Sequence, residues 1–404
     1  MTRVSVRTSV FSASPPPPVD TTPLPDVSGG WVPHLWLGAP ATGRLALPAA
    51  DPTMAWMYSP RGVFFDDHYL VVADSGNHRV LIWHGLPTHD EQPADVVLGQ
   101  PDGTTEGHGA GGRGPENGLN LPTGVLIADG RLVVADAWHH RILVWNTVPE
   151  TSSVPPDVVL GQKDFVSIDP NAGGECNAST LYWPFGVALI DSVFWVADTG
   201  NRRVLGWVGG IPEPGRPADI VLGQPDPVSR EENRGADVGP AGFRWPHAMT
   251  GREGLLLVAD AGDHRVVGWS RSLTGDPTAD CDADLVLGQP DLVTAREWPY
   301  GPQCGDRFRF PYAVCLDGGR LAVADTANNR ILLWDGMPDV GRPADHVLAQ
   351  PTFGANGENR WDAVTHDSLC WPYGLWLHGD LLAIADSGNN RVMMWRAERT
   401  TTCV

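Results

Sequence analysis

Short apolar runs of three to six residues, separated by polar turn residues, recur along most of the chain. Between residues 60 and 100 there are four such runs, at 62–65, 69–73, 80–83 and 96–98. Short runs rich in β-branched and aromatic residues, bounded by Gly, Pro, Asn and Asp, favour strands over helices. The pattern therefore predicts a meander of four antiparallel strands in this part of the chain.

The pattern of this region is repeated. The segment VVADSGNHRVLIW at 71–83 has five later copies, and every copy keeps an Asp, an Arg five residues later and a Trp four residues after that. The six copies carry Asp74, Asp136, Asp198, Asp260, Asp325 and Asp386; Arg79, Arg141, Arg203, Arg265, Arg330 and Arg391; and Trp83, Trp145, Trp207, Trp269, Trp334 and Trp395. Such a return at a fixed period indicates stacked copies of one supersecondary unit.

Four strands cannot bury both faces of their sheet alone, so we expect the units to pack around an axis. The predicted fold is all-β: a six-bladed β-propeller of four-stranded antiparallel blades, with repeats near 60–100, 122–162, 184–224, 246–289, 311–350 and 372–395. The sixth repeat lacks its last strand. Residues 34–40, HLWLGAP, match that strand, so we expect an N-terminal strand to complete the last blade and cover its edge.

The chain is predicted to hold one folded domain. Residues 1–30 are rich in proline and have no periodic pattern, which predicts a disordered lead. Residues 31–404 then form a single propeller domain.

The repeated pattern PxGV followed by VAD(S/T)GNxRV resembles the NHL repeat of bacterial-type NHL repeat-containing proteins, over about residues 31–395. The resemblance implies that the turn after each Asp and the long segment after each GQ lie on one face. It also implies that the residue after each repeated Pro surrounds the mouth of the central channel. These positions are Arg61, Thr123, Phe185, His247, Tyr312 and Tyr373.

Positions that are the same in all six repeats are interpreted as structural. A hairpin brings each repeated Asp close to its Arg, where a charge-assisted hydrogen bond would hold the turn. The repeated Trp residues are expected to pack between blades, because aromatic side chains bury a large area. A binding site needs residues that differ between repeats.

The candidate binding residues are those that differ between repeats. At the channel mouth they are Arg61, Phe185, His247, Tyr312 and Tyr373. The turn of the second repeat departs from the pattern with Trp138, His139 and His140, and a Trp beside two His in an exposed turn suits ligand stacking or metal binding. The long segments place Arg244, Arg296, Arg307 and Arg309 near aromatic residues, a composition typical of protein interfaces.

Catalytic motifs are incomplete in this sequence: GxSxG, HExxH and Walker-type loops are absent. Some NHL propellers that this chain resembles, the peptidyl-hydroxyglycine lyases, hold a catalytic zinc through three His at such channel positions. Only His247 matches, so we predict no metal and no cofactor. We expect a non-enzymatic scaffold that binds a protein or peptide, such as a subunit of a multi-subunit enzyme. The alternative is a metal-dependent lyase or hydrolase with its site at the channel mouth.

The charge and the cysteines limit the expected partners and location. The chain has 28 Lys and Arg against 48 Asp and Glu, a net charge of -20, which disfavours nucleic acid and anionic membranes as partners. The sequence has no apolar run long enough to span a membrane, no recognisable secretory signal, and six cysteines without a CxxC pair. We therefore expect a cytoplasmic monomer.

Overall fold

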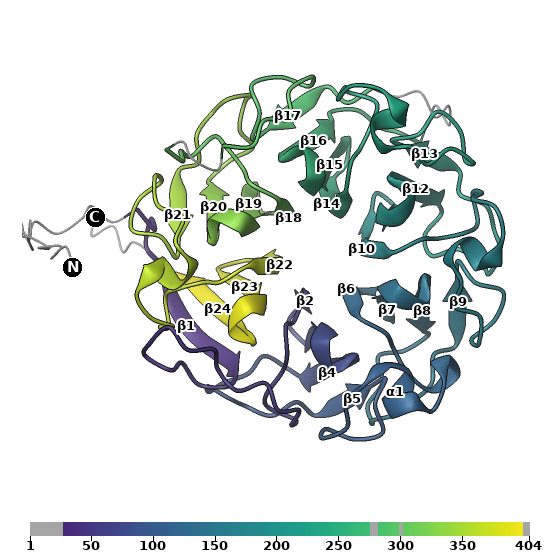
Figure 1. Cartoon of the computed structure of the whole chain (residues 1–404), viewed down its shortest axis with the longest axis horizontal. Helices are drawn as coiled ribbons and strands as arrows, with labels where there is room; N and C mark the ends of the chain where they lie inside the picture. The colour runs from purple at the N-terminus through teal and green to yellow at the C-terminus, as the bar shows by residue number, and fades with distance from the viewer. Residues whose placement is uncertain (1–26, 275–281, 299–301, 399–404) are drawn as a thin grey trace, which may run out of the picture.

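The computed structural model describes residues 27–274, 282–298 and 302–398. These residues form six four-stranded antiparallel sheets arranged as blades around a common axis (Figure 1). The first strand of each repeat lies nearest the axis and the following strands lie progressively outward. The predicted all-β six-bladed propeller is confirmed.

The strand bounds follow the repeats. The first three blades contain β2 (Gly62–Phe65), β3 (Tyr69–Asp74), β4 (Arg79–His84) and β5 (Val96–Leu98); β6 (Pro122–Ala128), β7 (Arg131–Asp136), β8 (Arg141–Trp145) and β9 (Val158–Leu160); and β10 (Pro184–Ile190), β11 (Val193–Asp198), β12 (Arg203–Val208) and β13 (Ile220–Leu222). The last three contain β14 (Pro246–Arg252), β15 (Leu255–Asp260), β16 (Arg265–Trp269) and β17 (Leu285–Leu287); β18 (Pro311–Asp317), β19 (Arg320–Asp325), β20 (Arg330–Trp334) and β21 (His346–Leu348); and β22 (Pro372–His378), β23 (Leu381–Asp386) and β24 (Arg391–Ala397), to which β1 (Trp31–Gly38) is added.

The N-terminal strand closes the ring. β1 pairs antiparallel with β24, with Trp31 opposite Ala397 and Gly38 opposite Arg391, so the first and last described strands lie side by side (Figure 1). The predicted closure is confirmed, although the strand begins at Trp31, before the HLWLGAP motif. Residues 27–30 form a turn, and the carbonyl of Val27 accepts a hydrogen bond from the Val347 amide at 2.8 Å. The rest of the predicted lead, residues 1–26, lies outside the described residues.

A one-turn 3-10 helix joins the second and third strand of every blade. The six are η1 (Ser75–Asn77), η3 (Ala137–His139), η5 (Thr199–Asn201), η7 (Ala261–Asp263), η8 (Thr326–Asn328) and η10 (Ser387–Asn389). The long segments between blades contain α1 (His108–Gly112), η2 (Pro115–Asn117), η4 (Pro170–Gly173), η6 (Glu232–Gly235) and η9 (Glu358–Trp361). Among these described helices, none is long and apolar enough to cross a bilayer.

The core lies between neighbouring blades. The six repeated Trp residues are all buried, and Trp83 belongs to an apolar cluster that also contains Leu37 of β1 and Met394 of β24. The indole N–H of Trp83 donates to the carbonyl of Gln92 at 3.0 Å, so its polar atom is satisfied. The predicted role of the repeated Trp in packing between blades is confirmed.

Candidate functional site

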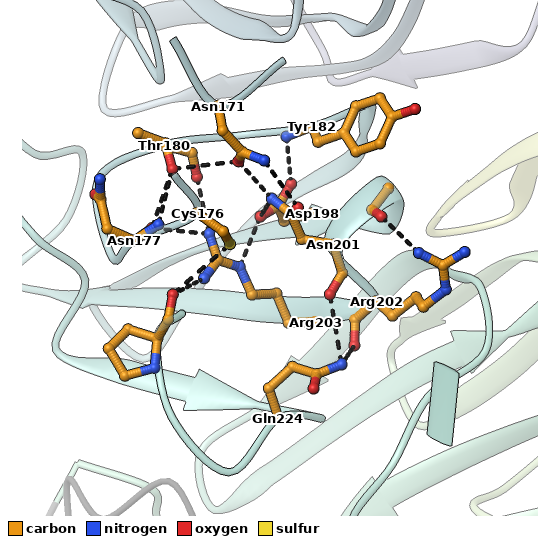
Figure 2. Close-up of polar contacts among 12 residues, drawn as sticks. Asn171, Cys176, Asn177, Thr180, Tyr182, Asp198, Asn201, Arg202, Arg203 and Gln224 are labelled. Carbon is orange, nitrogen blue, oxygen red and sulfur yellow. Dashed lines mark hydrogen bonds and ion pairs between the residues drawn. The ribbon is translucent and has the colours of Figure 1, made fainter. Parts of the chain in front are cut away.

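The repeated Asp and Arg form a buried ion pair in every blade. In the third blade Asp198 Oδ2 accepts hydrogen bonds from Arg203 Nε at 2.7 Å and from Asn201 Nδ2 at 2.8 Å (Figure 2). Its Oδ1 accepts from the backbone amide of Tyr182 at 2.7 Å. The same Arg–Asp contact occurs in the other five blades at 2.6 to 3.0 Å. We call each such pair, with its turn, a latch.

In five of the six blades the latch also holds the long segments on both sides of the blade, whereas Arg391 of the sixth blade bonds only the preceding segment. Arg203 Nη1 donates to the carbonyl of Pro227 in the following segment at 2.6 Å. Its Nη2 donates to the carbonyls of Asn177 and Thr180 in the preceding segment, both at 2.9 Å (Figure 2). Because its donors are used inside the protein, Arg203 stabilises the scaffold and is not available to a ligand.

In five of the six blades the residue that ends the latch turn ties one blade to the next. His78 Nδ1 accepts a hydrogen bond from the amide of Leu121, the residue before the next repeated Pro, at 3.0 Å. Equivalent bonds are made by His140, His264, Asn329 and Asn390. The third blade has Arg202 at this position, and a guanidinium cannot accept a hydrogen bond. The amide of Trp245 donates instead to Asp260 Oδ1 at 3.0 Å.

The residues predicted to surround the channel do so. Arg61, Thr123, Phe185, His247, Tyr312 and Tyr373 all line its narrow opening between the innermost strands. Four of them, Arg61, Phe185, His247 and Tyr312, also line a larger cavity of about 290 Å³, which reaches the latch turn of the third blade. The predicted ring is therefore confirmed as geometry, and its role in binding stays a prediction.

Aromatic side chains form most of the wall of this cavity. Trp138 and Trp183 stack with ring centroids 6.1 Å apart, and Tyr182 lies 5.0 Å from Trp183. Trp138 is 50% exposed and Trp183 is 38% exposed. We call the cavity, with its stacked Trp138 and Trp183, the mouth cavity. Its aromatic faces suit a flat or apolar ligand group.

His247 lies within the aromatic ring of the channel. Its ring is 4.4 Å from that of Phe185 and 4.5 Å from that of Tyr312, and its Nδ1 donates to the carbonyl of Trp245 at 2.9 Å. Burial, together with a smaller effect of the nearby positive charge of Arg61, lowers the pKa of His247 to about 4. His247 is therefore neutral at pH 7. In the described part of the chain, no three His, Cys, Asp or Glu side chains lie together in a group that could hold a metal.

The turn of the second blade is only partly exposed. Trp138 is exposed as predicted, whereas His139 and His140 are buried, so their predicted place on an exposed turn is wrong. His139 Nδ1 lies 2.9 Å from Asp136 Oδ2, at a position where four of the other latches have an Asn. His140 Nδ1 accepts a hydrogen bond from the amide of Trp183 at 3.2 Å. Both side chains occupy structural positions of the repeat, which explains their burial.

Six residues of the mouth cavity were not among the predicted site residues: Tyr182, Trp183, Thr199, Gly200, Arg202 and Trp245. Three of these residues do depart from the repeat pattern in the sequence. Trp183 and Trp245 stand before the repeated Pro, where the first two repeats have Ser59 and Leu121. Arg202 stands where the other five repeats have His or Asn.

The arginines differ in whether an acidic residue neutralises them. Among those singled out in the long segments, Arg244 pairs with Glu232 at 3.1 Å and Arg309 with Glu297 at 2.7 Å. In the mouth cavity, Arg61 lies over the ring of Tyr373 at 4.9 Å and Arg202 Nη1 donates to the carbonyl of Gly200 at 2.9 Å. The Nε atoms of both cavity arginines are buried and have no hydrogen-bond partner among the described residues.

Comparisons with known proteins agree with this architecture. A family model for the NHL repeat matches residues 119–145, which contain β6, β7, η3 and β8. NHL repeat-containing protein 2 of Bos taurus is 24% identical over 361 residues, covering 83% of this chain but only 46% of that protein. The chain thus spans less than half the length of this relative.

Two solved structures are similar to the propeller. A protein of unknown function from Bacteroides thetaiotaomicron superposes with a TM-score of 0.50 at 12% identity, covering 90% of this chain and 75% of that chain. Virginiamycin B lyase from Staphylococcus aureus gives a TM-score of 0.41 at 12% identity, covering 87% of this chain and 98% of that chain. From its repeats and its sheet topology, the chain is a six-bladed β-propeller, and its second repeat matches the model of the NHL repeat.

Proposed function

We propose that this protein is a binding module whose mouth cavity and surrounding loops engage a protein or peptide. The NHL-repeat propeller is a fold commonly used for protein interaction. Trp, Tyr and Arg are enriched among the residues that dominate binding energy at protein interfaces, and the mouth cavity is made largely of these three types.

The stacked Trp138 and Trp183 carry this proposal. Large aromatic side chains are usually buried, yet these two expose a third to a half of their surface beside a cavity. Their supports are rigid, because Trp183 precedes the repeated Pro184 and its amide is bonded to the latch turn of the second blade. A partner that covers them would remove apolar surface from water at little cost in side-chain entropy.

Selection from a phage-displayed library of random dodecapeptides on the immobilised full chain tests the proposal. We expect enriched peptides whose binding to the Trp138→Ala variant is at least tenfold weaker. The control is Trp361→Ala, which removes a Trp that is 69% exposed outside the mouth cavity.

Two results would contradict a peptide-binding role for this cavity. One is the absence of enrichment, or enrichment of peptides that bind wild type and Trp138→Ala equally. The other is one equivalent of zinc in the purified protein that is lost in a folded His247→Ala variant, since it would favour the metal-dependent enzyme.

A further inference from the structure

Arg202 is the point at which one repeat departs from the other five. His or Asn at this position accepts a hydrogen bond from the next blade in every other latch, and Arg202 gives that bond up. The backbone of Arg202 is left-handed, with φ of 56°, a conformation that Asn adopts more readily than Arg. An arginine here therefore lowers local stability, and such departures are concentrated at functional sites.

The exchange at Arg202 also rearranges the wall of the mouth cavity. In the other blades the residue before the repeated Pro has a positive φ, as in Trp183 at 51° and Phe310 at 50°. Trp245, which follows Arg202 around the ring, does not have a positive φ, and its carbonyl accepts the amide of Ala261 where the other blades use the preceding residue. Trp245 and Arg202 both line the mouth cavity.

The mouth cavity has two positive charges and no negative one. Arg61 and Arg202 line it, and its described lining contains no Asp or Glu. The Nε atom of each arginine is buried and lacks an acceptor among the described residues. Buried donors of this kind stabilise the protein only when an acceptor meets them, so the cavity is suited to an anion. This contrasts with the net charge of -20 of the whole chain.

The size and walls of the cavity restrict the kind of anion. Its volume of about 290 Å³ corresponds to roughly ten water molecules, which is room for about one amino-acid residue. The planar guanidinium binds a carboxylate through paired hydrogen bonds. A polynucleotide would bring many phosphates close to a strongly acidic protein, which disfavours it.

We infer that the mouth cavity recognises a carboxylate of its peptide partner, held by Arg61 and Arg202, with the adjoining aromatic or aliphatic group against Trp138 and Trp183. This inference rests on the proposed function and names the chemistry that the site selects. The carboxylate has two sources in a peptide, the free C-terminus and an acidic side chain, and both present the same group to the arginines.

Matched small ligands test the inference on the full chain. N-acetylphenylalanine carries a C-terminal carboxylate, N-acetylphenylalaninamide lacks it, and acetyl-Glu-Phe-amide carries only the acidic side chain. For ligands of this size we expect a Kd on the order of 1 mM. Ligand-detected NMR measures such affinities. We expect at least one of the two acids to bind at least tenfold more tightly than the neutral amide, and the acid that does so identifies the source of the carboxylate.

The arginines provide matched variants. Arg202→Asn restores the residue found in other latches and should fold well, so loss of binding cannot be attributed to unfolding. Arg61→Gln removes the second charge. Arg216→Gln is the control, because Arg216 pairs with Asp219 at the exposed outer part of the same blade and changes the net charge equally. We expect acid binding to weaken at least tenfold in the first two variants and to be unchanged in the control.

Distinct results overturn the inference and the proposed function. Equal binding of acid and amide, weakened by Trp138→Ala but not by Arg202→Asn, would refute carboxylate recognition and leave peptide binding standing. The inference would also be refuted if neither acid binds at a ligand concentration tenfold above the expected Kd. The peptide selection tests the proposed function separately. A single-stranded uridine octamer that binds more tightly than the acids and requires both arginines would reassign the site to nucleic acid.

Discussion

The latches and the mouth cavity lie close together on the same propeller but are built by opposite rules. All six latches have a buried Asp–Arg pair with nearly the same geometry. In five of them both terminal nitrogens of the Arg donate to backbone carbonyls, whereas Nη1 of Arg391 has no hydrogen-bond partner among the described residues. The residues that line the mouth cavity come from positions whose residue type differs between repeats, and its two arginines have buried Nε atoms without an acceptor among the described residues. In five latches the Arg donors are therefore satisfied inside the protein, whereas each of the two arginines of the mouth cavity keeps a buried donor without an acceptor among the described residues.

In the third latch, structural residues and a residue of the mouth cavity stand next to each other in the sequence. Asn201 and Arg203 complete the latch around Asp198, whereas the side chain of Arg202 is directed away from that pair (Figure 2). One turn therefore contributes to the scaffold through its first and third residues and to the mouth cavity through its second. Substitutions at neighbouring positions should consequently separate stability from binding.

Removing β1 should have the largest effect on stability. Deletion of residues 1–40 exposes the edge of β24 and removes the buried side chains Trp31, Leu35 and Leu37, a loss on the order of 5 kcal/mol. Circular dichroism melting and size-exclusion chromatography would show an unfolded or aggregated product. Deletion of residues 1–26 is the control and should melt like wild type; equal melting temperatures for both truncations would contradict the closure.

Breaking one latch should cost less than opening the ring. Asp198→Ala leaves Arg203 buried without its counter-charge, and we expect a loss of about 3 to 5 kcal/mol in urea unfolding. Asp219→Ala breaks the exposed pair with Arg216 and should cost less than about 1 kcal/mol. Similar costs for the two substitutions would show that the latch is not the main stabilising contact of the turn.

The fourth latch should make stability depend on pH. Asp263 replaces the usual Asn, and burial together with the neighbouring Asp260 raises its pKa to about 7. The folded protein therefore holds a proton on Asp263 that the unfolded chain releases near pH 4. The stabilisation from protonated Asp263 is present at low pH and is lost as pH rises to 7. Asp263→Asn supplies the donor permanently. Its stability advantage should grow between pH 5 and 8 to on the order of 2 kcal/mol, and a constant difference in urea unfolding across this range would contradict the assignment.

Trp138→Ala should have the smallest effect on the fold. The side chain is half exposed and its stack with Trp183 is its main ring contact, so the loss of unfolding free energy should be below about 1 kcal/mol. Peptide binding should nevertheless fall at least tenfold. A large loss of stability would show that Trp138 stabilises the fold and is not mainly a binding residue.

The scaffold was predictable because each strand signal occurs six times. Strands β2 to β5 lie within one residue of their predicted bounds, and the match of residues 34–40 to the missing strand placed β1 in the last blade. The site was predictable only in part. Arg61, Phe185 and Tyr312 follow a conspicuous Pro and were found, but the importance of Arg202 depends on the hydrogen bond that its counterparts make between blades, which the sequence does not display.

His139 and His140 show the opposite error. They looked like departures from the repeat because adjacent His residues are unusual, yet His139 replaces a latch Asn and His140 serves as the acceptor between blades. An imidazole nitrogen can perform the hydrogen bonding of an amide at either place. A change of residue type therefore marks a site only where the bonding of the repeat changes with it, as it does at Arg202.

The most direct test of the account is a paired measurement on Arg202→Asn: urea unfolding and ligand-detected NMR binding of N-acetylphenylalanine on one preparation. We predict stability equal to or about 0.5 to 1 kcal/mol above wild type, because Asn suits the left-handed backbone and restores the bond to the next blade. Binding should weaken at least tenfold. A variant that is less stable than wild type and binds the acid equally well would contradict the separation of latch from mouth cavity.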